Sequence, residues 1–136
     1  MTDSEFILVD TNVIVDVVEQ DDHWTDWSCE RMTEWTGRMM VNPIVFAELC
    51  YEAQDEADVD VVLLSLGLKY SEIPRRALFL AAQAFRMYRQ RGGVKTSPLP
   101  DFFIGAHAAV LNVPLLTRDV SRYQTYFPDV KLVCPD

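Results

Sequence analysis

The clearest hydrophobic run of the chain lies near its start. Residues 6–9 form a continuous apolar stretch that ends at the polar residues Asp10, Thr11 and Asn12. A short apolar run without alternation is typical of a strand that is buried on both faces of a parallel sheet. The pattern predicts such a strand, with Asp10 following its carboxyl end. The valine-rich segment 13–18 suits a helix capped by Thr11 or Asn12 and an extended segment equally well, because most of its residues are β-branched.

Predicted helices and strands alternate along the rest of the chain. Apolar periodicity and the positions of Gly and Pro predict helices over residues 24–36, 43–51, 75–91, 101–111 and 123–127. Short apolar runs predict further strands at residues 39–41, 69–73, 115–117 and 131–133. The acidic stretch 52–60 is expected to be a solvated connection before the apolar run 59–66, and the Gly- and Pro-rich stretch 91–100 is expected to be a mobile loop.

The segment 75–91 shows the most regular helical pattern. Five of its apolar residues share one face and are expected to pack on the core: Leu78, Ala81, Ala82, Phe85 and Tyr88. Arg86 and Arg89 lie off this face and are expected to be exposed.

Strands that alternate with helices predict an α/β fold with a parallel sheet and helices on both faces. Five strands are predicted, and the chain of 136 residues is the length of a single domain, so residues 1–136 are expected to form one domain. In such sheets a ligand binds beyond the carboxyl ends of the strands, where the strand order reverses. Asp10 and Asp119 both follow predicted strands and are expected at that edge.

Composition narrows the class of protein. With 49% hydrophobic and 24% charged residues, the chain fits a globular protein and not a disordered or fibrous one. Its apolar runs are shorter than the roughly 18 to 20 residues of a membrane helix, and residues 1–5 carry two acids and no base, which argues against a signal peptide. The expected location is the cytoplasm. Three cysteines without CxxC spacing indicate neither a disulfide framework nor a zinc knuckle.

Charge is unevenly distributed along the chain. The net charge is -9, yet residues 1–60 hold sixteen acids and two bases, whereas residues 69–95 hold seven bases and one acid. This asymmetry permits a basic surface for an anionic ligand on an otherwise acidic molecule. The alternative is an ordinary solvated helix face.

Acidic residues are the strongest candidates for chemistry. Taken singly, Asp10 could be a helix cap, Asp101 a first-turn acid and Glu48 a solvated side chain. Carboxylates that follow adjacent strands, however, raise one another's pKa unless a cation lies between them. Oxygen ligands favour Mg²⁺ or Mn²⁺ over zinc.

The four acids occur in local contexts that, taken together, resemble those of the PIN-domain ribonucleases, and in particular the VapC-type toxins. The matching motifs are Val9-Asp10-Thr11-Asn12, Ala47-Glu48-Leu49, Pro100-Asp101-Phe102-Phe103-Ile104-Gly105-Ala106-His107-Ala108 and Leu116-Thr117-Arg118-Asp119. The resemblance spans residues 6 to 133. Phe102-Phe103 departs from the usual pattern, in which a smaller residue often follows the third acid.

The resemblance implies a PIN-like three-layer α/β/α sandwich with a five-stranded, mostly parallel sheet. Asp10, Glu48, Asp101 and Asp119 would be both the catalytic residues and the ligands of one or two Mg²⁺ or Mn²⁺ ions. The metals would activate water for in-line attack on an RNA phosphodiester and leave 5′-phosphate and 3′-hydroxyl ends. Asn12 and Thr117 would orient these groups or the substrate.

The expected partners are an RNA substrate and a small VapB-like antitoxin protein, with no membrane; the oligomeric state is left open, a homodimer included. Arg86 and Arg89 are the candidate RNA contacts. Packing or a partner interface explains Trp24, Trp27 and Trp35 better than base stacking. His107, on an apolar helix, is interpreted as a packing histidine.

Three functions remain in competition. The first is a metal-dependent endoribonuclease that acts as the toxin of a toxin and antitoxin pair. The second is a housekeeping PIN nuclease that processes RNA without an antitoxin. The third is a non-catalytic module in which the acids bind a metal or a basic partner.

Overall fold

A five-stranded sheet forms the centre of the molecule. The computed structural model describes residues 5–97 and 99–136, and the strands lie in the order β3-β2-β1-β4-β5. Their bounds are β1 Ile7–Val9, β2 Met39–Val41, β3 Leu68–Tyr70, β4 Leu115–Leu116 and β5 Leu132–Val133. All four neighbouring pairs are parallel. The fold is a three-layer α/β/α arrangement, which confirms the predicted fold class.

The first strand is the middle strand of the sheet, as its uninterrupted apolar run predicted. Ile7, Leu8 and Val9 are completely buried. The chain adds β2 and β3 on one side of β1 and then crosses to place β4 on the other side, where Val9 pairs with Leu116. The strand order therefore reverses between β1 and β4. Residues that follow these two strands meet at the same edge of the sheet.

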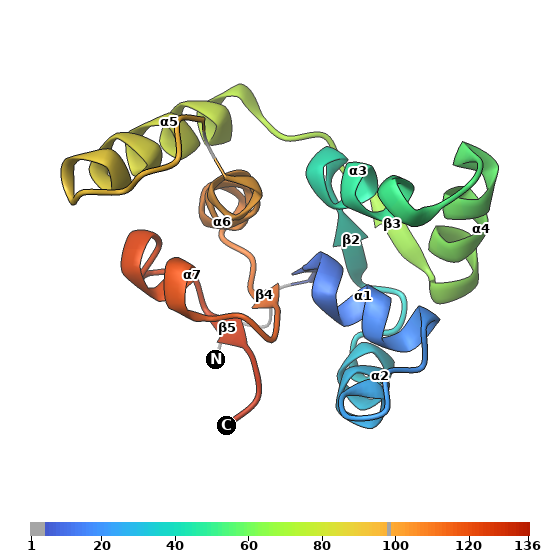
Figure 1. Cartoon of the computed structure of the whole chain (residues 1–136). Coiled ribbons are helices and arrows are strands. Elements are labelled where there is room, and N and C mark those ends of the chain that lie inside the picture. The colour runs from blue at the N-terminus through green and yellow to red at the C-terminus, as the bar shows by residue number, and fades with distance from the viewer. Residues whose placement is uncertain (1–4, 98) are drawn as a thin grey trace.

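Helices account for most of the remaining described chain (Figure 1). Their bounds are α1 Thr11–Val18, α2 Thr25–Glu34, α3 Pro43–Glu52, α4 Glu56–Leu66, α5 Arg75–Gln90, α6 Pro100–Leu111 and α7 Ser121–Tyr126. In the view of Figure 1, α1 to α4 lie on the right and α5 to α7 on the left. The ambiguous segment 13–18 is helical, because Asp10 caps it and Val13 and Ile14 are buried.

The expectation of a solvated connection over residues 52–60 is wrong in part, because the connection covers only residues 53–55 and α4 already begins at Glu56. The side chain of Asp55 caps this helix by accepting a hydrogen bond from Ala57 N at 3.0 Å. Glu56 and Asp58 then lie in its first turn, where acids interact favourably with the helix dipole. The high density of acids therefore marked the start of a helix.

The predicted core face of α5 is also wrong in part. Leu78 is 42% exposed and Ala82 is exposed, whereas Ala77, Ala81 and Ala84 are buried. Phe85 and Tyr88 are partly buried and pack against the core, as predicted. The third strand lies earlier than the predicted 69–73, since Leu68 is its first residue.

The predicted loop and the predicted absence of a membrane helix can be compared with the described residues. The loop predicted at 91–100 joins α5 to α6; Pro98 within it, and residues 1–4 at the start of the chain, lie outside the described residues. No helix in the described part of the chain has the length and apolar character needed to cross a bilayer. The three cysteines are free thiols.

Gly105 provides a test of the packing between α6 and α7. A Cβ at this buried position would lie 2.4 Å from Cδ2 of the Phe127 ring. We expect Gly105→Ala to lower the free energy of unfolding by about 1–3 kcal/mol, since overpacking forces neighbouring groups to move. Urea denaturation measures this loss. Phe127→Leu in the Gly105→Ala background should recover part of it; equal losses in the single and double variants would contradict this explanation.

Candidate active site

Asp10 lies at the centre of a hydrogen-bond network. It follows β1 directly, and its backbone N–H donates to Leu116 O at 2.9 Å. Its Oδ1 accepts from Thr11 N at 2.8 Å. Its Oδ2 accepts from the hydroxyls of Thr117 at 2.8 Å and Tyr123 at 2.9 Å. The carboxylate is thus fixed by three donors from three parts of the chain.

Burial raises the pKa of Asp10 to about 6, although the hydrogen bonds from Thr117, Tyr123 and Thr11 lower it, and the nearby charge of Asp101 raises it further. The side chain is only 5% exposed. An acid in this position stays protonated well above its ordinary range. A cation that compensated the buried charge would favour the ionised form.

Asp101 and Asp119 complete a group of three neighbouring acids. Asp101 lies in the first turn of α6, and Asp119 follows β4. Burial raises the pKa of Asp101, the Arg122 guanidinium lowers it, and the charge of Asp119 raises it. Arg122 Nη1 lies 3.3 Å from Asp101 Oδ2. Burial and the charges of all three acids raise the pKa of Tyr123, so its phenol remains a donor.

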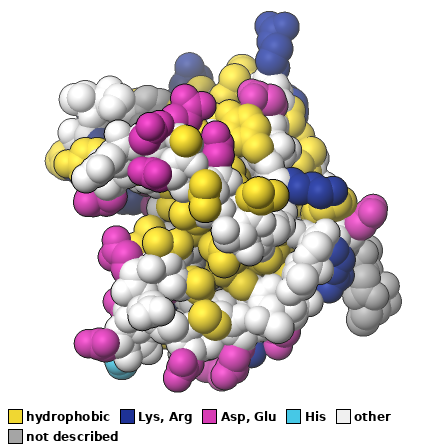
Figure 2. Space-filling view, turned by 90° about the vertical axis from the view of Figure 1, so that its right-hand side faces the viewer, with side chains coloured by type: hydrophobic (Ala, Val, Ile, Leu, Met, Phe, Trp, Pro, Cys, Tyr) yellow, Lys and Arg dark blue, Asp and Glu magenta, His cyan; other side chains and the backbone are white. Residues whose placement is uncertain are grey.

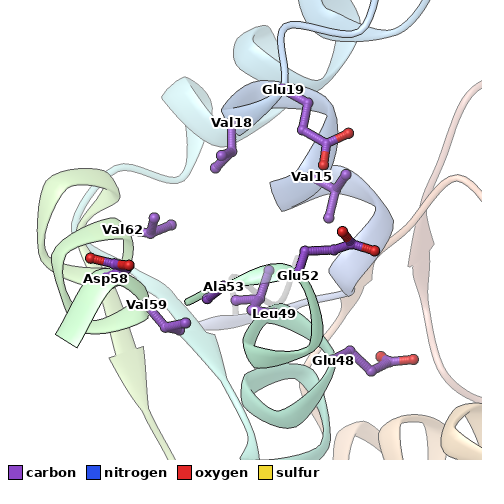
Figure 3. A pocket seen from close by; sticks show the side chains of 10 residues that line it. All are labelled: Val15, Val18, Glu19, Glu48, Leu49, Glu52, Ala53, Asp58, Val59 and Val62. Carbon is purple, nitrogen blue, oxygen red and sulfur yellow. The ribbon is translucent and has the colours of Figure 1, made fainter. Parts of the chain in front are cut away.

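Glu48 reaches this group through Thr11. It is exposed on α3, and its Oε1 accepts from Thr11 Oγ1 at 2.6 Å. Since the Thr11 N–H binds Asp10, one residue links the two acids. Glu48 also lines an apolar groove between α1, α3 and α4, where it lies at one end of the groove in Figure 3.

Asn12 and Thr117 lie directly behind the acids. Thr117 Oγ1 contacts Asp10, accepts from Asp119 N at 3.0 Å, and lies 3.4 Å from Asn12 Nδ2. Asn12 Oδ1 in turn accepts from Arg118 N at 3.1 Å. These side chains join the end of β1 to the segment after β4.

The donor chemistry of the site fits a hard divalent cation. The candidate ligands are carboxylate oxygens, which Mg²⁺ and Mn²⁺ prefer. Burial raises the pKa of Asp10 and of Asp101, so uncompensated negative charge on these two carboxylates is costly. Within residues 5–97 and 99–136, however, no three His, Cys, Asp or Glu side chains form a ready-made ligand set.

Arg86 and Arg89 are exposed on α5. Arg89 Nη1 donates to Lys95 O at 2.7 Å and so holds the segment after the helix. In the described chain, neither arginine forms an ion pair with the four acids. Arg122, which sequence reasoning did not single out, is the base that contacts Asp101.

His107 is completely buried, and its Nδ1 lies 3.3 Å from Asn42 Nδ2. Its Nε2 is buried without a partner among the described residues. Burial lowers the pKa of its imidazole, so the ring is neutral at physiological pH.

The tryptophans are partly buried, and each ring faces an arginine of this chain. The centroid distances are 4.9 Å for Trp24 to Arg118, 5.8 Å for Trp27 to Arg31 and 4.5 Å for Trp35 to Arg38. These contacts agree with a packing role.

Tyr123, Thr11 and Arg122 were missed from the sequence. Tyr123 follows Asp119 by four residues, but α7 begins only at Ser121, so helical spacing does not relate these two side chains and the sequence offered no signal for Tyr123. The pairing of Arg122 with Asp101 had no signal, because the two residues lie far apart in the sequence.

A model of the PIN-domain family matches residues 7–127. The chain belongs to the PIN-domain family. PIN domains are generally nucleases. A search of curated protein sequences finds no match.

Several solved structures share the PIN fold of this chain. A chain in the crystal structure of VapBC2 from Rickettsia felis bound to a promoter DNA fragment is 19% identical, with a TM-score of 0.70 over 96% of this chain and 99% of that one. A chain of DNA-bound VapBC from Salmonella typhimurium is 17% identical, with a TM-score of 0.72 over 96% and 98%. A chain of a toxin-antitoxin complex from Klebsiella pneumoniae is 19% identical, with a TM-score of 0.65 over 93% and 95%.

The phenol of Tyr123 is expected to tune the central acid of this PIN domain. Tyr123→Phe removes one donor from Asp10 Oδ2, and the pKa of Asp10 should rise above about 6. A net hydrogen bond of about 1 kcal/mol corresponds to a pKa shift of about 0.7 unit. Carboxyl NMR titration of the metal-free protein measures this shift. Tyr126→Phe, on the same helix, is the control; an unchanged Asp10 pKa in Tyr123→Phe would contradict the assignment.

Proposed function

We propose that this PIN domain is a divalent-metal-dependent endoribonuclease and the toxin of a toxin and antitoxin pair, acting in the cytoplasm as a single domain over residues 1–136. The observation that carries the proposal is the buried carboxylate of Asp10, with Asp101 and Asp119 beside it, at the point where the strand order reverses. Ligands of parallel α/β proteins bind at such a point.

The acids would hold Mg²⁺ or Mn²⁺, with Asp10 as the central ligand and Glu48, Asp101 and Asp119 around it. When bound, the metal would supply positive charge that stabilises the transition state of phosphodiester hydrolysis and makes water a stronger nucleophile. Thr117 and Tyr123 keep Asp10 in one orientation through their hydroxyl donors. Arg122 lies beside Asp101 and carries a charge that can meet a phosphate.

The proposed substrate is RNA, and the basic segment 69–95 would attract its backbone. Arg86 and Arg89 are exposed on α5 and available to phosphates. The remainder of the molecule is acidic, which would orient the polyanion towards this helix.

The proposed protein partner is a small antitoxin, as in the structurally similar complexes. Figure 2 shows the side of the molecule at the right of Figure 1, where hydrophobic side chains gather in the middle and acidic ones lie towards the left and lower margins. The groove between α1, α3 and α4 has a volume of about 270 Å³, and its lining includes valines of α1 and α4 together with the acids Glu19, Glu48, Glu52 and Asp58 (Figure 3). A basic amphipathic segment of the antitoxin fits this combination.

The test is cleavage of a panel of structured RNAs, including transfer and ribosomal RNA fragments, by the purified protein. We expect cuts at a few sites with Mg²⁺ or Mn²⁺, none with excess chelator and none by Asp119→Asn. Growth arrest on expression, relieved by a co-expressed small partner, would support the toxin assignment.

Other outcomes would redirect the function. Metal-dependent cleavage without any effect on growth would favour a housekeeping PIN nuclease. Metal binding without cleavage of any nucleic acid would overturn the enzymatic proposal and favour a binding module.

A further inference from the structure

A buried aspartate interrupts the apolar side of α1. Asp16 is 2% exposed and stands between Val15 and Val17. A buried carboxylate is costly unless it is paired and hydrogen-bonded, so its partners indicate its role. Arg118 donates to it twice, from Nε to Oδ2 at 2.6 Å and from Nη2 to Oδ1 at 2.9 Å. Ser28 Oγ adds a third donor at 2.8 Å.

Arg118 is held by more than its ion pair. Its guanidinium lies 4.9 Å from the centroid of the Trp24 ring, and its backbone N–H donates to Asn12 Oδ1. The planar fork of an arginine that binds both oxygens of a carboxylate has one preferred orientation. The backbone at Arg118 is thereby fixed from its main chain and from its side chain.

Three side chains at or within α1 therefore bind two consecutive residues after β4. Asp10 binds the Thr117 hydroxyl, Asn12 binds the Arg118 backbone, and Asp16 binds the Arg118 guanidinium. Thr117 and Asp119 flank Arg118 in the chain. The contact between Asp16 and Arg118, which we name the α1 clamp, therefore acts on the segment that carries two groups of the acid site.

Stability alone is a poor explanation of the α1 clamp. Replacing a buried ion pair by apolar side chains of similar volume is often neutral or stabilising. Apolar side chains would also pack α1 against this segment, but apolar contacts are non-directional. A bidentate ion pair adds a defined orientation of the backbone, and orientation is what ligands of a metal site need.

We propose that Asp16 and Arg118 are positioning residues of the acid site. Their ion pair fixes residues 117–119 so that the Thr117 hydroxyl and the Asp119 carboxylate keep their places beside Asp10. Asp16 and Arg118 are not among the proposed metal ligands and would act on the site only through residues 117–119. The effect on catalysis rests on the proposed nuclease function, whereas the effect on the order of residues 117–119 does not.

The experiment compares Arg118→Lys, Arg118→Leu and Asp16→Asn with a matched control, Arg31→Lys. Arg31 has the same 26% side-chain exposure as Arg118 and also lies over a tryptophan, but its acidic partners are Glu30 and Glu34 in its own helix. Three quantities are measured: hydrogen exchange of the Asp119 amide in the metal-free protein, Mn²⁺ affinity by electron paramagnetic resonance, and kcat and KM for RNA cleavage.

The Arg118 and Asp16 variants are expected to exchange the Asp119 amide at least tenfold faster, because its hydrogen bond to Thr117 Oγ1 loses its support. Mn²⁺ affinity should fall about 10- to 100-fold, the usual effect of losing a group that orients metal ligands. In cleavage, kcat should fall while KM for RNA stays constant. Arg31→Lys should leave all of these quantities unchanged.

Unchanged Asp119 exchange in Arg118→Lys and Asp16→Asn would overturn the proposal, as would equal effects in Arg31→Lys. If Arg118→Leu does not fold, Arg118→Lys, which keeps the charge, and Asp16→Asn, which keeps the size, still decide the result. If the wild-type protein cleaves no RNA while Asp119 exchange increases in these variants, the nuclease function fails and the positioning role stands.

Discussion

Asp10→Asn is expected to abolish metal-dependent RNA cleavage while the protein remains folded. Loss of a central metal ligand removes several kcal/mol of transition-state stabilisation, which corresponds to about a 1000-fold lower rate. The substitution conserves the size of the side chain, removes its charge and replaces one accepting oxygen by an amide NH2 group. Cleavage assays at saturating Mn²⁺ measure the rate.

Asp10→Asn, which should lower activity, is expected to raise the stability of the protein at neutral pH. The pKa of Asp10 is raised from 3.8 to about 6, so the protonated form favours folding below about pH 4 and this contribution is lost as the pH rises through 6. The ionised side chain then opposes folding at neutral pH by on the order of 3 kcal/mol. Asp10→Asn removes this unfavourable charge and so stabilises the protein at neutral pH. Its amide NH2 group, however, faces a hydrogen-bond donor, and this mismatch costs about 1–3 kcal/mol and offsets part of the stabilisation.

Denaturant titrations at pH 4 and pH 8 separate these effects. The free energy of unfolding of Asp10→Asn minus that of the wild type should be more positive at pH 8 than at pH 4. The control is Asp129→Asn, an exposed acid that should change neither activity nor the pH dependence. An Asp10→Asn protein that cleaves normally would disprove the catalytic assignment, and one that is unfolded at pH 8 would show that the buried charge is structural.

Phe102→Ala is expected to cause the largest loss of stability among the substitutions considered. Phe102 is completely buried, and its ring centroid lies 6.2 Å from Phe85, 5.7 Å from Tyr88 and 5.3 Å from Tyr126. The ring therefore joins α5, α6 and α7 directly beside Asp101. Its removal should lower the free energy of unfolding by about 3–5 kcal/mol, because it loses both burial and packing and leaves a cavity.

Phe103→Ala is the matched control for this position. Phe103 is only partly buried, and its truncation should cost about 1–2 kcal/mol. Urea denaturation of both variants compares the losses. Equal losses would show that the aromatic cluster around Phe102 contributes little beyond ordinary burial.

Much of the fold was determined by local pattern. The apolar run at residues 6–9 predicted the central strand, and the alternation of strands and helices predicted a parallel sheet. Parallel strands must be buried on both faces and joined by crossovers, so their signature is written in short windows of sequence. The family also followed from sequence, because the ordered acids keep their local contexts.

Two predictions were wrong in part for different reasons: the position at which α4 begins, Glu56, and the face of α5 that packs on the core. Acids in a first turn resemble a solvated loop unless the capping Asp55 is recognised. On α5, Ala77, Ala81 and Ala84 are buried in preference to the larger Leu78. Which apolar residues of α5 face the core depends on how the helix packs against its neighbours, mainly α6, and that packing is not a property of one helix.

The sequence by itself determined which acidic residues are the candidates for the site and that Asp10 and Asp119 follow strands. Only the tertiary structure decided that Tyr123 donates to Asp10, that Arg122 contacts Asp101, and that Arg118 binds Asp16. Each of these contacts joins segments far apart in the chain. Periodicity and capping report on neighbours within a few residues, whereas the polar partners of a buried carboxylate are chosen by the way whole elements pack.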